Sequence, residues 1–140
     1  MNVDPYLHFN GNCEEAFRLY EKALGGKIEM MMTYDQAPPG DNPTPKGWEK
    51  KIMHVRLSVG DQIIMASDAP PGHYTPMAGF SVSLAPDSKE KAEKIFNALA
   101  PGGKVIMPFQ KTFWAEGFGM VTDRFGTPWM VNFAGNAQVG

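Results

Sequence analysis

Residues 117–133, GFGMVTDRFGTPWMVNF, predict a β-hairpin whose turn has its own hydrogen-bonding chemistry. The apolar and aromatic residues on either side of the turn indicate strands at Gly117–Thr122 and Trp129–Phe133. Between these strands, the Asp123 side chain can accept a hydrogen bond from the backbone amide two residues on. Gly126 can adopt a positive φ because it has no Cβ. The hairpin is also the end of a pattern that occurs twice in the chain.

The repeated pattern is a strand, a helix and then three strands. In the first half, the periodicity predicts a strand at 5–9, a helix over roughly 13–24 that Asn12 caps, and strands at 27–34, 51–59 and 62–67. In the second half it predicts a strand at 79–84, a helix from Asp87 or Ser88 to about residue 100, a strand at 104–109 and the hairpin at 117–133.

The spacing of equivalent residues supports a duplication. Leu24 and Leu99 are 75 positions apart, and GGKIEM at 25–30 matches GGKVIM at 102–107, 77 positions later. We therefore expect an α+β protein of two βαβββ modules. The limits that we predict are 1–70 for the first module, with an irregular loop at 35–50, 71–77 for a linker, 78–134 for the second module and 135–140 for a tail.

The composition is that of a soluble globular protein. The 140 residues are 43% hydrophobic and 20% charged, and the net charge of −2 without a basic run argues against nucleic-acid binding. No apolar run approaches the ~20 residues that a membrane-spanning helix needs, so we expect no membrane partner. The start of the chain does not look like a signal peptide, and Cys13 stands alone, so a cytoplasmic location is expected.

Three segments together resemble one known superfamily. FNGNCEEAFRLYEKALGG at 9–26, HVRLSVGDQIIMASD at 54–68 and FWAEGFGMVTDRFGTPWMV at 113–131 are similar to the PhnB-like branch of the vicinal-oxygen-chelate superfamily, which includes glyoxalases, bleomycin-resistance proteins and extradiol dioxygenases. The resemblance implies a glyoxalase-like fold, in which curled mixed or antiparallel sheets surround a cavity, and a homodimer.

The resemblance also implies four positions where enzymes of the superfamily hold a divalent metal on His or Glu. In this chain those positions, to within about one residue, are Pro5, Ile64, Phe80 and Met130. None of these side chains is a ligand for a divalent cation, and the adjacent Tyr6, Met65, Gly79 and Trp129 do not restore the site. We therefore predict no metal at the usual site and no cofactor, although a divalent metal at other positions stays open. Members of this branch are sometimes labelled demethylubiquinone methyltransferases, but we find no glycine-rich loop suited to S-adenosylmethionine.

His54 is the candidate for catalysis or for ligand contact, because it begins a strand on the face that carries Arg56 and Ser58. The alternative is a histidine that a neighbouring group satisfies at a strand end. Aromatic and methionine side chains suit a small organic ligand, although Trp129 can equally belong to the core. The predicted ligand-binding residues are Tyr6, His54, Met65, Asp68, Phe113, Trp114, Glu116 and Trp129.

Three functions fit these observations. The first is a small-molecule binding protein that lacks the usual metal ligands. The second is a metal-dependent lyase, isomerase or dioxygenase of the same superfamily that uses His54 in a non-standard site. The third is a structural or interaction dimer with a vestigial cavity.

Overall fold

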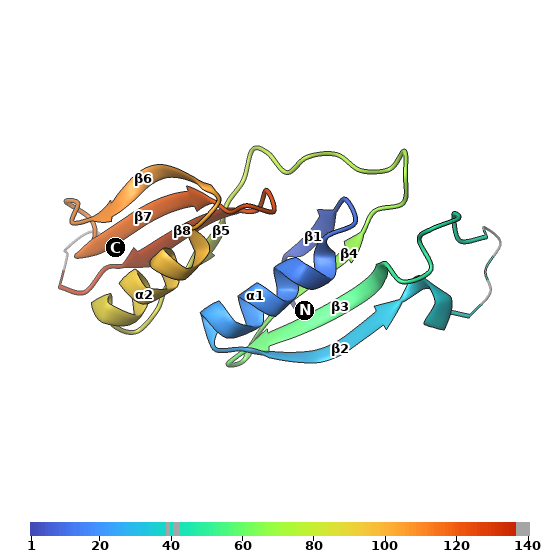
Figure 1. Ribbon diagram of the computed structural model, residues 1–140. Coiled ribbons are helices and arrows are strands. Elements are labelled where there is room, and N and C mark those ends of the chain that lie inside the picture. Colours follow the sequence, from blue (N-terminus) through green and yellow to red (C-terminus); the bar gives the residue numbers. More distant parts are fainter. Residues whose placement is uncertain (39, 41–42, 137–140) are drawn as a thin grey trace. The chain divides into compact units, whose positions relative to one another are not determined.

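The computed structural model describes residues 1–38, 40 and 43–136, so parts of the predicted 35–50 loop and the predicted 135–140 tail lie outside the described residues. The chain divides into two compact units, Met1–Pro76 and Met77–Gly140. Each unit contains one α-helix and one four-stranded sheet (Figure 1).

The first unit is a βαβββ module. Its elements are β1 (Tyr6–Phe9), α1 (Cys13–Leu24), β2 (Lys27–Thr33), the 3₁₀ turn η1 (Tyr34–Gln36), β3 (Ile52–Val59) and β4 (Gln62–Asp68). The strand order is β1-β4-β3-β2, with β1 parallel to β4 and the other pairs antiparallel.

The second unit repeats this topology. Its elements are β5 (Val82–Leu84), α2 (Lys89–Leu99), β6 (Lys104–Gln110), β7 (Gly117–Thr122) and β8 (Pro128–Phe133). The order β5-β8-β7-β6, with β5 parallel to β8, matches the first sheet strand for strand. The predicted α+β fold of two βαβββ modules is therefore confirmed. Each sheet is open rather than closed on itself.

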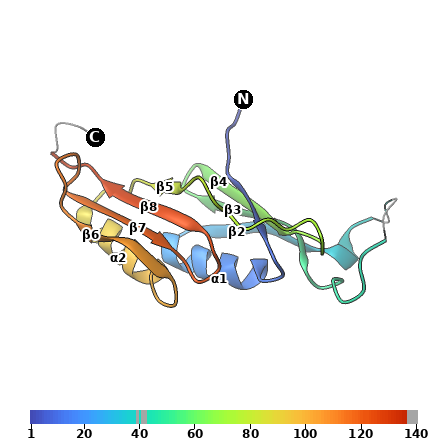
Figure 2. The ribbon, with the colours of Figure 1, turned by 90° about the horizontal axis from the view of Figure 1, so that it is seen from above.

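One face of each sheet is covered by the helix of the same unit (Figure 2). In the first unit, α1 buries Ala16, Phe17, Tyr20 and Leu24 against buried strand residues, namely Leu7, Phe9, Val55, Leu57 and Ala66. Because side chains alternate along a strand, the residues between these buried ones lie on the opposite, helix-free face of the sheet. The helix thus determines which side chains of each strand remain available.

A β-bulge in β2 decides which methionines reach the helix-free face. Met31 is paired with the buried Val55, whereas Met30 is paired with Arg56 and Met32 with His54. The register shifts between Ile28 and Met30, because a bulge adds one residue to a strand and resets its alternation.

The ends of the elements differ in part from the prediction. Helix α2 is capped by Ser88, whose hydroxyl accepts a hydrogen bond from the Lys91 amide at 3.1 Å. Asn12 occupies the N-cap position of α1 as predicted, but its side chain makes no capping hydrogen bond. Strand β5 is shorter than the predicted 79–84, and Phe80 lies outside it with its side chain exposed.

The second glycine of each GGK motif is required for the same structural reason. A Cβ on Gly26 would lie 2.5 Å from the Ser58 carbonyl oxygen, and a Cβ on Gly103 would lie 2.3 Å from the Thr122 carbonyl oxygen. In both units the chain that leaves the helix passes directly against the end of a strand, and only glycine fits there.

Candidate functional site

The helix-free face of the first sheet, which we term the open face, gathers polar and methionine side chains from four strands. One row runs across the whole sheet, since Tyr6 is paired with Met65, Met65 with Arg56 and Arg56 with Met30. Neighbouring residues in such a row lie on strands that are about 4.8 Å apart. A second row contains His8 beside Ser67 and His54 beside Met32.

Tyr6 and His54 form a hydrogen-bonded pair on the open face. The Tyr6 hydroxyl lies 3.2 Å from His54 Nδ1, and the two rings stack with centroids 5.7 Å apart and planes 30° apart. The centroid of the His8 ring lies 5.3 Å from that of the Tyr6 ring. When the phenol donates to Nδ1, the proton of the neutral imidazole is on Nε2, which is then a donor for another molecule. The pair is thus an imidazole oriented by a phenol.

The structure brings together three of the predicted site residues on this face: Tyr6, His54 and Met65. Sequence reasoning placed Arg56 beside His54 but did not include it among the ligand contacts. His8 also lies on this face with Tyr6, although it was not included among the predicted ligand contacts. The strict alternation of β1, with Leu7 and Phe9 buried, is the signal that could have identified His8.

Asp68, another predicted ligand contact, has a structural role instead. Its side chain is 1% exposed, and Oδ1 accepts hydrogen bonds from the amides of Gly11 and Cys13 at 2.9 and 3.0 Å. Oδ2 accepts a hydrogen bond from the Ile52 amide at 2.8 Å. The carboxylate therefore caps the start of α1 and ties it to the start of β3, the role that the sequence suggested for Asn12.

The environment of Asp68 also perturbs two neighbouring groups. Burial raises the pKa of the Cys13 thiol, and the carboxylates of Asp68 and Glu14 raise it further. Burial, with the charge of Asp68, likewise raises the pKa of Tyr34, whose hydroxyl donates to the Asp68 carbonyl oxygen at 2.7 Å. Cys13 is therefore a protonated thiol near neutral pH and a poor nucleophile.

Trp129 belongs to the core of the second unit. Its side chain is 1% exposed, and its Nε1–H donates to Asp123 Oδ2 at 2.8 Å. Asp123 Oδ1 accepts from the amides of Phe125 and Thr127 at 2.8 and 3.0 Å, which confirms the predicted side-chain bond to the amide two residues on. The core alternative for Trp129 is therefore the one that its geometry supports.

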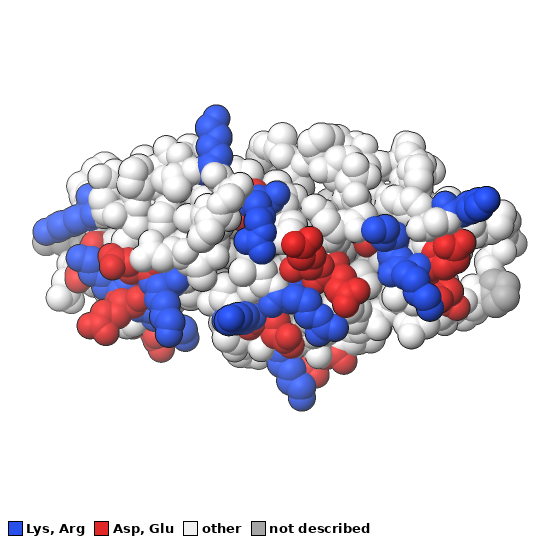
Figure 3. Space-filling view, in the orientation of Figure 1, with Lys and Arg blue, Asp and Glu red and all other residues white. Residues whose placement is uncertain are grey.

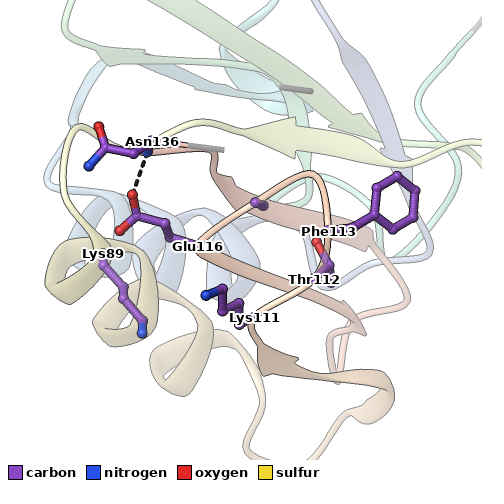
Figure 4. Close-up of a pocket in the computed structure, with 7 residues that line it drawn as sticks. Lys89, Lys111, Thr112, Phe113, Glu116 and Asn136 are labelled. Carbon is purple, nitrogen blue, oxygen red and sulfur yellow. Dashed lines mark hydrogen bonds between the residues drawn. The ribbon is translucent and has the colours of Figure 1, made fainter. Parts of the chain in front are cut away.

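A hollow of about 450 Å³ in the second unit contains two further predicted residues, Phe113 and Glu116. Figure 4 shows Glu116 turned toward Asn136, whose backbone amide donates a hydrogen bond to Glu116 Oε2. The Phe113 ring points away from the other labelled side chains (Figure 4). Phe113 is 82% exposed. The remaining lining residues are Lys89, Lys111, Thr112, Ala115 and Asn136, so the hollow presents polar and apolar surface together.

Trp114 lies at the edge of an aromatic cluster. Its ring packs edge to face against Phe118 and Phe113, with centroids 5.2 and 4.8 Å apart. Phe118, which sequence reasoning did not single out, is buried on the face of β7 opposite α2, because its neighbours Gly119 and Val121 pair with the buried Val131 and Trp129. The cluster offers aromatic surface without a charged group.

The charges and donor groups fit neither a nucleic-acid surface nor a metal cluster. On the face seen in Figure 3, basic and acidic side chains are intermixed rather than sorted into a basic stripe. Among residues 1–38, 40 and 43–136, no group of three His, Cys, Asp or Glu side chains could hold a metal ion. Ile64, one of the four usual metal positions, is buried beside Leu57 on the side of α1. In the same ranges, no helix is long and apolar enough to cross a membrane.

Comparison with known proteins finds relatives over nearly the whole chain. The family described as 3-demethylubiquinone-9 3-methyltransferase matches residues 1–132. Protein YjdN from Escherichia coli K12 is 36% identical over 139 residues, which cover 94% of this chain and 95% of that protein. The crystal structure of protein PA1353 from Pseudomonas aeruginosa is 53% identical with a TM-score of 0.85, covering 95% of this chain and 97% of that one.

Two further solved structures share the fold. A putative 3-demethylubiquinone-9 3-methyltransferase, PhnB protein, from Bacillus cereus is 24% identical with a TM-score of 0.75, covering 96% of this chain and all of that one. A glyoxalase/bleomycin resistance protein/dioxygenase family enzyme from Burkholderia phytofirmans PsJN is 14% identical with a TM-score of 0.62, covering 94% and 96%.

Proposed function

Because this chain belongs to the 3-demethylubiquinone-9 3-methyltransferase family, the PhnB-like branch of the vicinal-oxygen-chelate superfamily, we propose that it binds a small organic molecule. The ligand lies on the open face of the first sheet, in contact with Tyr6, His54 and Met65. The observation that supports this most is the Tyr6–His54 pair, which presents an oriented imidazole beside methionine side chains. Aromatic and thioether groups give a ligand contact area, and a few fixed polar groups orient it.

The methyl transfer named in the family's description is not part of this proposal. A methyltransferase has to hold S-adenosylmethionine, and glycine-rich loops at helix N-termini are the usual device for holding such charged cofactors through backbone amides. The glycine pairs of this chain follow helices instead: Gly25 ends α1 with φ 67°, and Gly102 follows α2 with φ 77°. A helix C-terminus presents carbonyl oxygens rather than amides.

The second unit adds proposed contacts of its own. Phe113, Trp114 and Glu116 stay as proposed ligand contacts there, because Trp114 offers the edge of an aromatic cluster and Glu116 lines the hollow. We further propose that the protein is a homodimer in the cytoplasm. The dimer rests on the family resemblance, and the location on the single cysteine, which is a buried free thiol.

A thermal-shift screen of small organic molecules tests the proposal. A ligand at 100 times its Kd stabilises the protein by about 2.7 kcal/mol, which raises the midpoint of unfolding measurably. We expect at least one compound to lose its shift in Tyr6→Ala and Met65→Ala variants but to keep it in an Ile106→Ala variant, since Ile106 is an exposed residue of β6 outside the proposed contacts. Compounds whose shifts survive both open-face variants, or a broad screen without a stabilising compound, would contradict binding at this face.

A further inference from the structure

The open face contains an arginine without a partner between two methionines. Arg56 is paired with Met65 on one side and with Met30 on the other, and its side chain is exposed. In the part of the chain that the structure describes, no ion pair or hydrogen bond of the Arg56 guanidinium is found. A guanidinium has five N–H donors and no acceptor, so this is the largest unused hydrogen-bonding group on the face.

The other polar groups of the open face are also mainly donors. The Tyr6 hydroxyl is hydrogen-bonded to His54 Nδ1, which leaves the Nε2–H of a neutral imidazole as a donor. Lys27 adds a second cation, paired with Ser58 at the far end of the sheet. Glu29 in the bulge is an acidic group beside Ser58, and its Oε1 already accepts a hydrogen bond from the Ser58 hydroxyl at 2.8 Å. A complementary ligand therefore carries acceptors and negative charge.

The spacing of these donors suits one small molecule. Arg56 and His54 are two residues apart on the same face of β3, which separates their backbone positions by about 7 Å. Tyr6 lies two strands away from Arg56 in the same row, a distance of roughly 10 Å. Met65 lies between them, so an apolar ligand body can pack on its thioether while polar ends reach either side.

We propose that the open face selects anionic molecules with an apolar body and a carboxylate. Arg56 binds the carboxylate through two parallel N–H···O bonds, and His54 Nε2–H donates to a second acceptor atom of the ligand. The side chains of Met30 and Met65 pack against the apolar part. This inference names the ligand class of the proposed binding function and rests on that function.

Binding of a matched pair of probes, 1-naphthoate and 1-naphthamide, tests this selection. The two probes share the aromatic body and differ in charge, so their affinity ratio reports the anion contact alone. Isothermal titration calorimetry of the full chain should show at least tenfold tighter binding of the carboxylate at low salt. The ratio should fall toward one in an Arg56→Met variant and decrease with ionic strength, because Coulomb attraction at an exposed site is screened. Arg56→Lys should keep part of the ratio, because the charge stays while the bidentate geometry is lost.

Arg18→Met is the matched control, since Arg18 is an exposed arginine of α1 in the same unit. Its guanidinium forms an ion pair with Glu14 and donates a hydrogen bond to the Met31 sulfur. This variant should keep the wild-type affinity ratio. Equal binding of both probes to the wild type, lost in Tyr6→Ala, would overturn the anion selection while leaving small-molecule binding intact. Preference for the carboxylate that survives Arg56→Met, or that is lost equally in Arg18→Met, would also overturn it. Absence of binding by either probe, together with an unsuccessful thermal-shift screen, would overturn both proposals.

Discussion

Replacing Asp68 should destabilise the first unit more than any exposed acidic substitution. In Asp68→Ala, the amides of Gly11, Cys13 and Ile52 lose their acceptor. A buried donor without a partner costs about 1–3 kcal/mol, and water that enters the space left by the carboxylate recovers part of this. We therefore expect a loss of roughly 3–6 kcal/mol, a large part of the 5–15 kcal/mol that typically holds a domain together.

Asp68→Asn tests the contributions of the two carboxylate oxygens separately. The amide oxygen can take the place of Oδ1, which serves two amides, but the NH2 group then faces the Ile52 amide. Two donors in contact leave one buried amide unsatisfied, so the expected loss is about 2 kcal/mol. In urea, with a slope near 2 kcal/mol/M, this shifts the midpoint by about 1 M. Asp61→Asn, in the exposed β3–β4 turn, is the matched control and should change the stability by less than about 0.5 kcal/mol.

Amide hydrogen exchange shows which segments the Asp68 substitution destabilises. The amides of Gly11, Cys13 and Ile52 should lose protection in Asp68→Asn before those of the second unit do. If Asp68→Ala and Asp61→Asn had equal urea midpoints, or if these three amides kept their protection, the assignment of Asp68 as the anchor of α1 and β3 would be refuted.

Three other substitutions test separate parts of the fold. Gly103→Ala should destabilise by about 3 kcal/mol in chemical unfolding, because its Cβ would lie 2.3 Å from a carbonyl oxygen, whereas Gly40→Ala, with open space at its Cβ, should be neutral. Trp129→Phe should lower the stability by roughly 2–4 kcal/mol through the lost bond to Asp123, and an unchanged thermal midpoint would contradict this. The pKa of Cys13 is higher in the folded protein than in the unfolded chain, so the free energy of unfolding should fall as the pH rises above about 8.5. Relative to Cys13→Ala, the wild type should lose up to about 1.4 kcal/mol per pH unit. Parallel plots of stability against pH for the wild type and Cys13→Ala would refute that coupling.

Local chemistry accounts for the features that the sequence predicted well. The turn at 123–127 depends on Asp123 and Gly126, which act within a few residues, and both behave as expected. The apolar stripe of α1, with Ala16, Phe17, Tyr20 and Leu24, also follows from spacing alone. The repeat then fixed the order of strands, since two segments that share one pattern adopt one topology.

The candidate site could be predicted only in part. Tyr6 and His54 were identified one by one from their strands, but their hydrogen bond joins residues 48 positions apart. The β2 bulge, which sends Met30 and Met32 to the open face, leaves no reliable mark in the alternation of the sequence. Asp68 was predicted as a ligand contact, and its three backbone partners could not be foreseen because these amides come from two other segments.

The sequence by itself therefore determined the family, the two modules and, outside the β2 bulge, the alternation of strand residues between the two faces of a sheet, because these depend on periodicity and local turn chemistry. Only the tertiary structure decided which polar side chains have hydrogen-bond partners within the fold. Asp68 and Trp129 are used by the fold, whereas Arg56 is left without a partner among the described residues and Tyr6 orients His54. The physical reason is that hydrogen-bond partners are set by pairing between distant strands and by a one-residue bulge, neither of which local sequence specifies.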